Sequence, residues 1–267
     1  MAPDPSSSLK AAHHCPPQAH RLEAFFTGNA YAPHRHDTYA IGITMQGVQS
    51  FDYRGQTRNA LPGNIVVLHP DELHDGRAGT EDGFRYRTLY IEPSHIQSVL
   101  GGRALPFIEG GISLDPRLYA VVLPLLENLD RPLETLEYQD AVYNLAMVME
   151  QITNDQKPLK RHACQAAELA RQFIHDHMDE EITLDVLGKI SDCDRWELSR
   201  HFRTMFGTSP YRYLVMRRLD QARMMMITGN SIAQTAIACT FSDQSHFTRH
   251  FKKAYGLTPK QWTANFA

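Results

Sequence analysis

The stretch LSRHFRTMFGTSP, from Leu198 to Pro210, lines up with FTRHFKKAYGLTP, from Phe247 to Pro259. Arg, His, Phe, Gly and Pro recur at constant spacing. Other positions carry the same type of residue in both copies: aromatic, hydroxyl or basic. Self-similarity at a fixed offset is the signature of a repeated structural unit. The C-terminal part of the chain is therefore predicted to contain one unit twice.

Each copy shows the pattern of two helices joined by a tight turn. The first helix is predicted over 184–190 and 232–239, and the second begins at Asp194 in one copy and near Asp243 in the other. The predicted N-caps of the first helices and the glycines that end the second helices are Thr183, Asn230 or Ser231, Gly207 and Gly256. Such a pair of helices is a helix-turn-helix, whose second helix enters the major groove of DNA.

The second helices carry polar side chains opposite their apolar stripe, where they are predicted to face base edges. Arg can bond guanine bidentately, Gln can do so with adenine, and an indole can pack on a thymine methyl group. The predicted base contacts are Arg195, Trp196, Ser199, Arg200, Gln244, Ser245, His246 and Arg249. Phosphate contacts are predicted one turn later for Arg203, Lys252 and Lys253. A helix over 210–228 would hold the two reading helices about 34 Å apart, one turn of DNA.

Charge supports this assignment of the C-terminal part. Residues 157–267 carry 16 Lys and Arg against 11 Asp and Glu, a net charge of +5, whereas residues 1–156 carry −8. The four cysteines are scattered without a CxxC pair, which argues against a disulfide framework and fits a reducing cytoplasm. No run of eighteen apolar residues occurs, so no membrane span is predicted, and the Pro/Ser-rich start lacks the apolar core of a secretory signal.

The N-terminal part shows short alternating strands broken by turns from Tyr31 to Glu92, typical of a small β-barrel or sandwich. Helical periodicity follows from Pro116 and again over about 134–152. The fold class is predicted as α+β, with a barrel and helical extension before an all-α domain. The predicted domains are a disordered lead over 1–20, a sensor and dimerisation domain over 21–153, a linker over 154–162 and a DNA-binding domain over 163–267.

These features resemble the AraC/XylS family of transcription regulators. The second copy, ACTFSDQSHFTRHFKKAYGLTP from Ala238, is similar to that family's signature, and the stretches 34–39, 47–51 and 61–75 are similar to its cupin-like sensor domain. Thr240 stands where the family usually has Gly, and because a β-branched residue disfavours positive φ, the turn is expected to be shaped differently. Asp192 replaces the corresponding Gly of the first copy, where Asp is better tolerated.

The resemblance implies a cytoplasmic regulator that binds double-stranded DNA and a small-molecule effector, forms a homodimer and has RNA polymerase as a candidate partner. The resemblance implies no cofactor. The effector would lie in the barrel, against His34, His36, Tyr39, Ile41, Phe51, His69 and His74.

Two alternatives remain open from the residues alone. His-x-His on one strand places both rings on one face, and imidazole suits several transition metals, so His34, His36 and a later histidine, His69 or His74, could form a metal site. The glutamate of enzymatic cupins is missing after His36. The simpler interpretation is therefore that these histidines line a pocket without binding a metal. A metal-dependent cupin enzyme with an accessory helical domain is one rival function, and a protein-interaction module is another.

Overall fold

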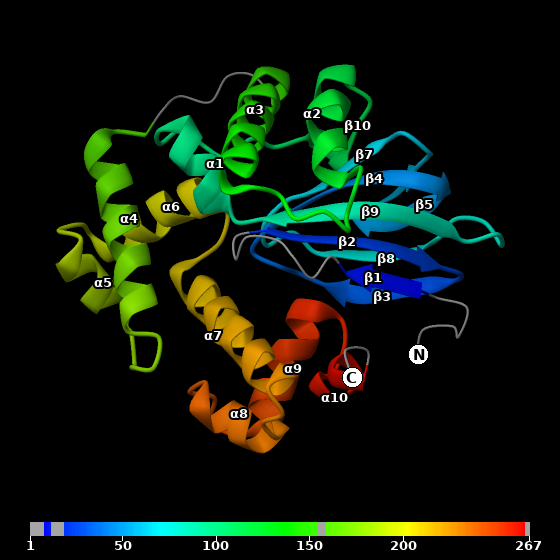
Figure 1. Cartoon of the computed structure of the whole chain (residues 1–267). Helices are drawn as coiled ribbons and strands as arrows, with labels where there is room; N and C mark the ends of the chain where they lie inside the picture. Colours follow the sequence, from blue (N-terminus) through cyan, green and yellow to red (C-terminus); the bar gives the residue numbers. More distant parts are fainter. Residues whose placement is uncertain (1–7, 12–18, 154–158, 265–267) are drawn as a thin grey trace. The chain divides into compact units, whose positions relative to one another are not determined.

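The computed structural model describes residues 8–11, 19–153 and 159–264 (Figure 1). Leaving aside His34–Asp37, its contacts divide the chain at one boundary, between Pro158 and Leu159. Within the described ranges, every helix is too short or too polar to cross a bilayer. Two sheets form the core of the N-terminal unit, and helices alone form the C-terminal unit.

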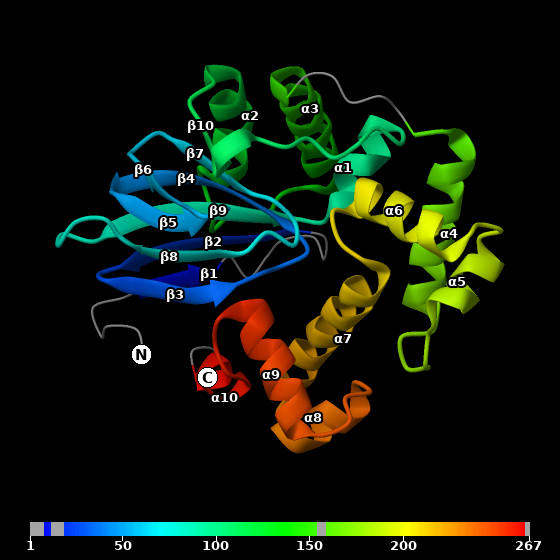
Figure 2. The same ribbon diagram turned by 180° about the vertical axis from the view of Figure 1, so that it is seen from behind.

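The larger sheet has six strands in the order β1-β2-β9-β4-β7-β10. These strands are β1 (Ser8–Ala11), β2 (Ala19–Phe26), β9 (Phe84–Ile91), β4 (Tyr39–Gly47), β7 (Ile65–Leu68) and β10 (Ile112–Ser113). The smaller sheet, seen from behind in Figure 2, has the order β3-β8-β5-β6. Its strands are β3 (Asn29–His34), β8 (His74–Ala78), β5 (Gln49–Tyr53) and β6 (Gln56–Ala60). The predicted barrel followed by helices is confirmed.

Three helices and a short 3₁₀ turn complete this unit (Figure 1). They are α1 (Pro93–Leu100), η1 (Glu109–Gly111), α2 (Pro116–Leu126) and α3 (Thr135–Thr153). Leu118 and Val122 of α2 and Leu145 of α3 belong to one buried cluster with side chains of β4, β7 and β9. These helices therefore cover one face of the six-stranded sheet.

The other face of that sheet looks toward the smaller sheet. Val66 of β7 clusters with Phe51 and Tyr53 of β5, so the inner core lies between the two sheets. Side chains alternate along a strand, and Tyr39 and Ile41 of β4 belong to the outer cluster beneath the helices. The prediction that Tyr39 and Ile41 line the barrel interior is therefore wrong, whereas Phe51 does lie on the inner side.

Arg21 ties the six-stranded sheet to the C-terminal end of α2. Its guanidinium is buried, and it donates to the carbonyl oxygens of Leu125 at 3.0 Å, Asn128 at 3.3 Å and Arg131 at 2.5 Å. The last carbonyls of a helix have no partner within the helix and carry its negative dipole end, so a cation is well placed there.

The boundaries of the predicted lead and linker differ in part from the structure. Ser8–Ala11 form β1 and β2 begins at Ala19, so 1–20 is not wholly a disordered lead; residues 1–7 and 12–18 lie outside the described residues. Residues 154–158 of the predicted linker also lie outside them, and α4 begins at Arg161, two residues before the predicted domain start.

The C-terminal unit contains two helix-turn-helix motifs, α5–α6 and α8–α9, joined by α7. The helices of this unit are α4 (Arg161–Asp176), α5 (Leu184–Ile190), α6 (Arg195–Phe206), α7 (Pro210–Ile227), α8 (Ile232–Ala238), α9 (Gln244–Tyr255) and α10 (Pro259–Ala264). The two motifs have separate apolar cores, one around Phe202 and the other around Phe251. The duplicated unit predicted from the repeat is confirmed.

The ends of these helices follow the predicted chemistry. Asp194 and Asp243 cap α6 and α9 with their carboxylates, and Gly207 and Gly256 end them in the left-handed conformation. Of the two N-cap candidates for α8, the structure uses Ser231, which forms a reciprocal capping box with Gln234.

The turns inside the two motifs share one backbone feature. Asp192 has a φ of 47° and Thr240 a φ of 63°, both in the left-handed region. The turn at Thr240 is therefore not reshaped to avoid positive φ, contrary to the expectation. The motifs differ instead in the length of the turn, since one residue lies between Asp192 and the cap Asp194, whereas two lie between Thr240 and the cap Asp243.

We expect Arg21→Met to destabilise the N-terminal unit by about 2–3 kcal/mol, because it leaves buried carbonyls without a charged donor. Urea unfolding of the full chain, followed by circular dichroism, measures this change. Arg103→Met is the matched control, because Arg103 is half exposed and pairs with Glu150 at the surface, where a pair contributes about 1 kcal/mol or less. Equal losses in the two variants would contradict the structural role of Arg21.

We expect Thr240→Gly to stabilise the C-terminal unit by about 0.5–1 kcal/mol. Left-handed φ costs a non-glycine residue roughly 1–2 kcal/mol, and the greater freedom of unfolded glycine offsets part of the gain. Both tryptophans, Trp196 and Trp262, lie in this unit, so tryptophan fluorescence during urea unfolding reports it. Thr228→Gly, at a C-cap with a φ of −80°, has no such strain to relieve and should destabilise. A loss of stability in Thr240→Gly would refute the strain.

Candidate nucleic-acid interface and sensor core

The exposed face of α6 carries polar and aromatic side chains. Trp196 is 60% exposed, and the guanidinium of Arg195 lies 5.0 Å from the centroid of its ring. Arg195 also pairs with Asp185 of α5 at 2.8 Å. Arg200 projects into solvent, with Glu197 3.7 Å away. The predicted outward positions Arg195, Trp196 and Arg200 are thus available to a ligand.

Ser199 is placed differently from the prediction. It is only 9% exposed, and its hydroxyl and carbonyl oxygens accept hydrogen bonds from the Arg203 guanidinium one turn later. Position 199 lies beside the buried stripe of Leu198 and Phe202, which turns it away from solvent. Ser199 therefore positions Arg203, and the prediction that it faces base edges is wrong.

The exposed face of α9 is more basic. Gln244, Ser245 and Arg249 are exposed, as are the basic side chains at its C-terminal end, Lys252 and Lys253. His246 is half-buried, and its Nδ1 lies 3.0 Å from the Ser242 hydroxyl. His246 is thus held against the turn at the start of the helix, at the edge of the surface formed by the other predicted residues.

The repeat places one exposed arginine of each reading helix at equivalent positions. Leu198 of the first copy corresponds to Phe247 of the second, so Arg200 corresponds to Arg249. Leu198 and Phe247 are both fully buried, which sets the same rotation of each helix about its axis. Arg200 and Arg249 therefore point away from their own cores in the same sense.

The contact between Asp185 and Arg195 was not predicted from the sequence. Asp185 lies in the first turn of α5, ten positions before Arg195, and no helical or strand periodicity links the two. A shallow hollow between α5 and α6 is lined by Asp185, Gly188, Lys189, Asp192, Cys193, Asp194, Arg195 and Trp196. Only the packing of α5 on α6 brings the Asp185 carboxylate to the edge of the reading surface.

In the N-terminal unit, His69 is a fixed structural residue. Its Nε2 accepts a hydrogen bond from the backbone N–H of Ile108 at 2.8 Å, so the proton lies on Nδ1, which donates to the Tyr53 hydroxyl at 2.5 Å. Phe107 stacks on the ring with centroids 4.1 Å apart. Burial, aided by the charge of Arg54, lowers the pKa of His69 to about 3. Both ring nitrogens are thus engaged by the protein itself.

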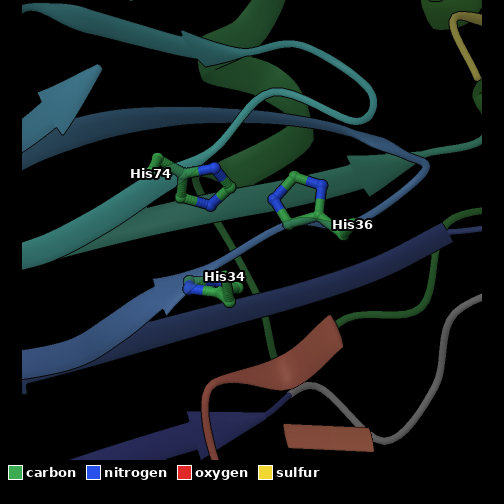
Figure 3. A group of neighbouring side chains, drawn as sticks. All are labelled: His34, His36 and His74. Atoms are coloured by element: carbon green, nitrogen blue, oxygen red, sulfur yellow. The ribbon is translucent and has the colours of Figure 1, made fainter. Parts of the chain in front are cut away.

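The other three histidines singled out from the sequence lie together. His34 ends β3, His36 follows two residues later, and His74 begins β8, the neighbour of β3 in the smaller sheet. All three are buried, and each offers a ring nitrogen within 4.8 Å of the others (Figure 3). The later histidine of the predicted group is therefore His74, since the Nε2 of His69 is already occupied.

Comparisons with known proteins match both units. Residues 17–146 match the model of the AraC-like ligand binding domain, and residues 187–265 match a helix-turn-helix domain. The HTH-type transcriptional activator RhaS of Escherichia coli K12 is 23% identical over 265 residues, covering 90% of this chain and 95% of RhaS. The HTH-type transcriptional regulator YbfI of Bacillus subtilis is 24% identical over 224 residues, covering 80% of each chain.

Among solved structures, ToxT from Vibrio cholerae superimposes with a TM-score of 0.66 at 12% identity, covering 93% of this chain and 98% of ToxT. A second ToxT structure, which holds an unsaturated fatty acid, has a TM-score of 0.60 at 13% identity and covers 98% of this chain and 96% of ToxT. At this identity the likeness concerns the fold: a β-rich domain followed by paired helix-turn-helix motifs.

Proposed function

This chain is a transcriptional regulator of the AraC family, with an AraC-like ligand-binding domain before a helix-turn-helix domain, and we propose that Arg200 and Arg249 are its principal base-reading residues. The observation that carries the proposal is their equivalent, exposed position on the second helix of each motif. A guanidinium there can donate two hydrogen bonds to the major-groove edge of guanine.

Around these two arginines, the proposed base contacts are Arg195, Trp196, Gln244 and Ser245, with His246 at the edge. The stacking of Arg195 on Trp196 supports this set, because it holds a planar donor beside an apolar ring that can meet a thymine methyl group. Arg203, Lys252 and Lys253, near the C-terminal ends of α6 and α9, are the proposed phosphate contacts.

The N-terminal domain is proposed to bind its effector on the inner side of the sheets, near Phe51 and the histidines His34, His36 and His74. Tyr39 and Ile41 lie on the outer face and His69 is fully bonded, so none of these three is retained. An effector can switch the regulator only if it binds one arrangement of the chain more tightly than another. We propose a sensing role for this domain, without catalysis, because both curated relatives are regulators.

We further propose that the chain forms a homodimer and contacts RNA polymerase. Leu136 and Tyr143, seven positions apart on α3, are 68% and 55% exposed, which supports a homodimer that buries this face of α3. RhaS is a transcriptional activator, which supports activation by this chain through contact with RNA polymerase in the cytoplasm.

Alanine at Arg200 or at Arg249 should weaken binding to the cognate operator by about 1–3 kcal/mol and relax selectivity at one base pair for each residue. Electrophoretic mobility shifts with operator variants, identified by selection from random duplexes, measure both effects. Arg161→Ala removes an exposed arginine at the start of α4, outside both motifs, and should leave affinity and selectivity unchanged. Full operator affinity in both Arg200→Ala and Arg249→Ala would contradict the assignment of α6 and α9 as the base-reading helices.

The Lys252→Ala/Lys253→Ala double variant should weaken binding almost equally for all DNA sequences. Two phosphate contacts fewer should make the plot of log K against log salt concentration shallower by about 2. Fluorescence anisotropy with labelled duplex at several salt concentrations measures the slope, and Lys160→Ala, at the N-cap of α4, serves as the control. A loss confined to the cognate operator with an unchanged slope would instead make these lysines base-reading residues.

A further inference from the structure

Three histidines at the end of β3 and the start of β8 have their ring nitrogens close together, as the ligands of a metal ion do. His34 and His36 come from the end of β3 and the residues directly after it, and His74 comes from the first position of β8. Their ring nitrogens lie within 4.8 Å of one another, and their side chains face a common space (Figure 3). A zinc–imidazole bond is about 2.0–2.1 Å long, so the rings must turn toward a common point for all three nitrogens to reach one ion.

The tautomer of His74 fits this role. Its Nδ1 lies 2.9 Å from the backbone carbonyl oxygen of Glu72. A carbonyl can only accept, so Nδ1 carries the proton and Nε2 keeps its lone pair. A hydrogen bond from the second ring nitrogen to a backbone carbonyl is also the contact that orients histidine ligands around metals.

His69 shows the opposite arrangement in the same domain. A backbone N–H occupies its Nε2 and a tyrosine its Nδ1, so neither nitrogen can turn to an ion without breaking a buried hydrogen bond. His69 is therefore not part of the group, and the distances between ring nitrogens select His34, His36 and His74.

The donor set defines the class of ion. Neutral imidazoles suit Zn²⁺, Ni²⁺, Cu²⁺, Co²⁺ and Fe²⁺, and they suit Mg²⁺ and Ca²⁺ poorly. Within the ranges that the structure describes, no carboxylate or thiolate belongs to the group. Three protein ligands leave one position open on a tetrahedral ion. We propose that His34, His36 and His74 bind one divalent transition-metal ion in the sensor domain, independently of how the C-terminal motifs read DNA.

The test uses the full chain, stripped with a chelator, desalted and titrated with Co²⁺, whose ligand-field bands report tetrahedral coordination. The wild type should bind one Co²⁺ per chain with intense visible bands that Zn²⁺ abolishes. His34→Gln, His36→Gln and His74→Gln should each weaken Co²⁺ binding at least tenfold. His95→Gln alters a half-buried histidine bonded to Tyr138 and should leave binding unchanged.

Two further measurements keep the proposal testable if a variant folds poorly. Zn²⁺ should raise the melting temperature of the wild type and of His95→Gln, because a ligand that binds only the folded state stabilises it. X-ray absorption of the wild type with one equivalent of Zn²⁺ should show three imidazole ligands. Fewer than three imidazoles, or equal Co²⁺ binding by wild type and all three histidine variants, would overturn the site. Loss of operator binding by the Arg200→Ala and Arg249→Ala variants tests the reading helices separately.

Discussion

The burial of one apolar stripe on each reading helix is the constraint on which the rest of the DNA-binding surface depends. Phe202 and Phe251 are fully inaccessible, and truncating such a side chain typically costs about 3–5 kcal/mol. Rotating α6 or α9 about its axis would expose these rings. Their burial therefore fixes the direction in which Arg200 and Arg249 point, and the aspartate and glycine at the two ends fix where each helix begins and ends.

Charge distinguishes the two motifs although their backbones are alike. In the first motif Arg195 pairs with Asp185, and Arg200 lies near Glu197, whereas the sequence of α9 contains no acidic residue. Exposed pairs of this kind contribute roughly 0–1 kcal/mol, so DNA can break them at little cost. The second motif is thus better suited to hold phosphate, and the first has its donors arranged beforehand by neighbouring carboxylates.

The six-stranded sheet performs a different task on each of its faces. Its outer face packs under α1–α3, where Arg21 and Arg87 both donate to carbonyls at the C-terminal end of α2 or just after it. Its inner face meets the smaller sheet, which carries the three histidines at the meeting of β3 and β8. Side chains that alternate along β4 therefore belong either to the packing of the helices or to the space between the sheets.

The amino-acid sequence by itself determined the two helix-turn-helix motifs, their boundaries to within a residue or two, and the order of a strand-rich domain before a helical one. These features depend on local periodicity, caps and turn residues, and both copies of the repeat carry the same signals. Sequence could not decide the faces of β4, because its first six residues are all buried and alternation of polarity is lost there. It also could not decide that Ser199 turns inward, that Asp185 meets Arg195, or that His74 and not His69 joins His34 and His36. Those outcomes depend on which elements pack together across long stretches of chain, and only the tertiary structure brings the partners within bonding distance.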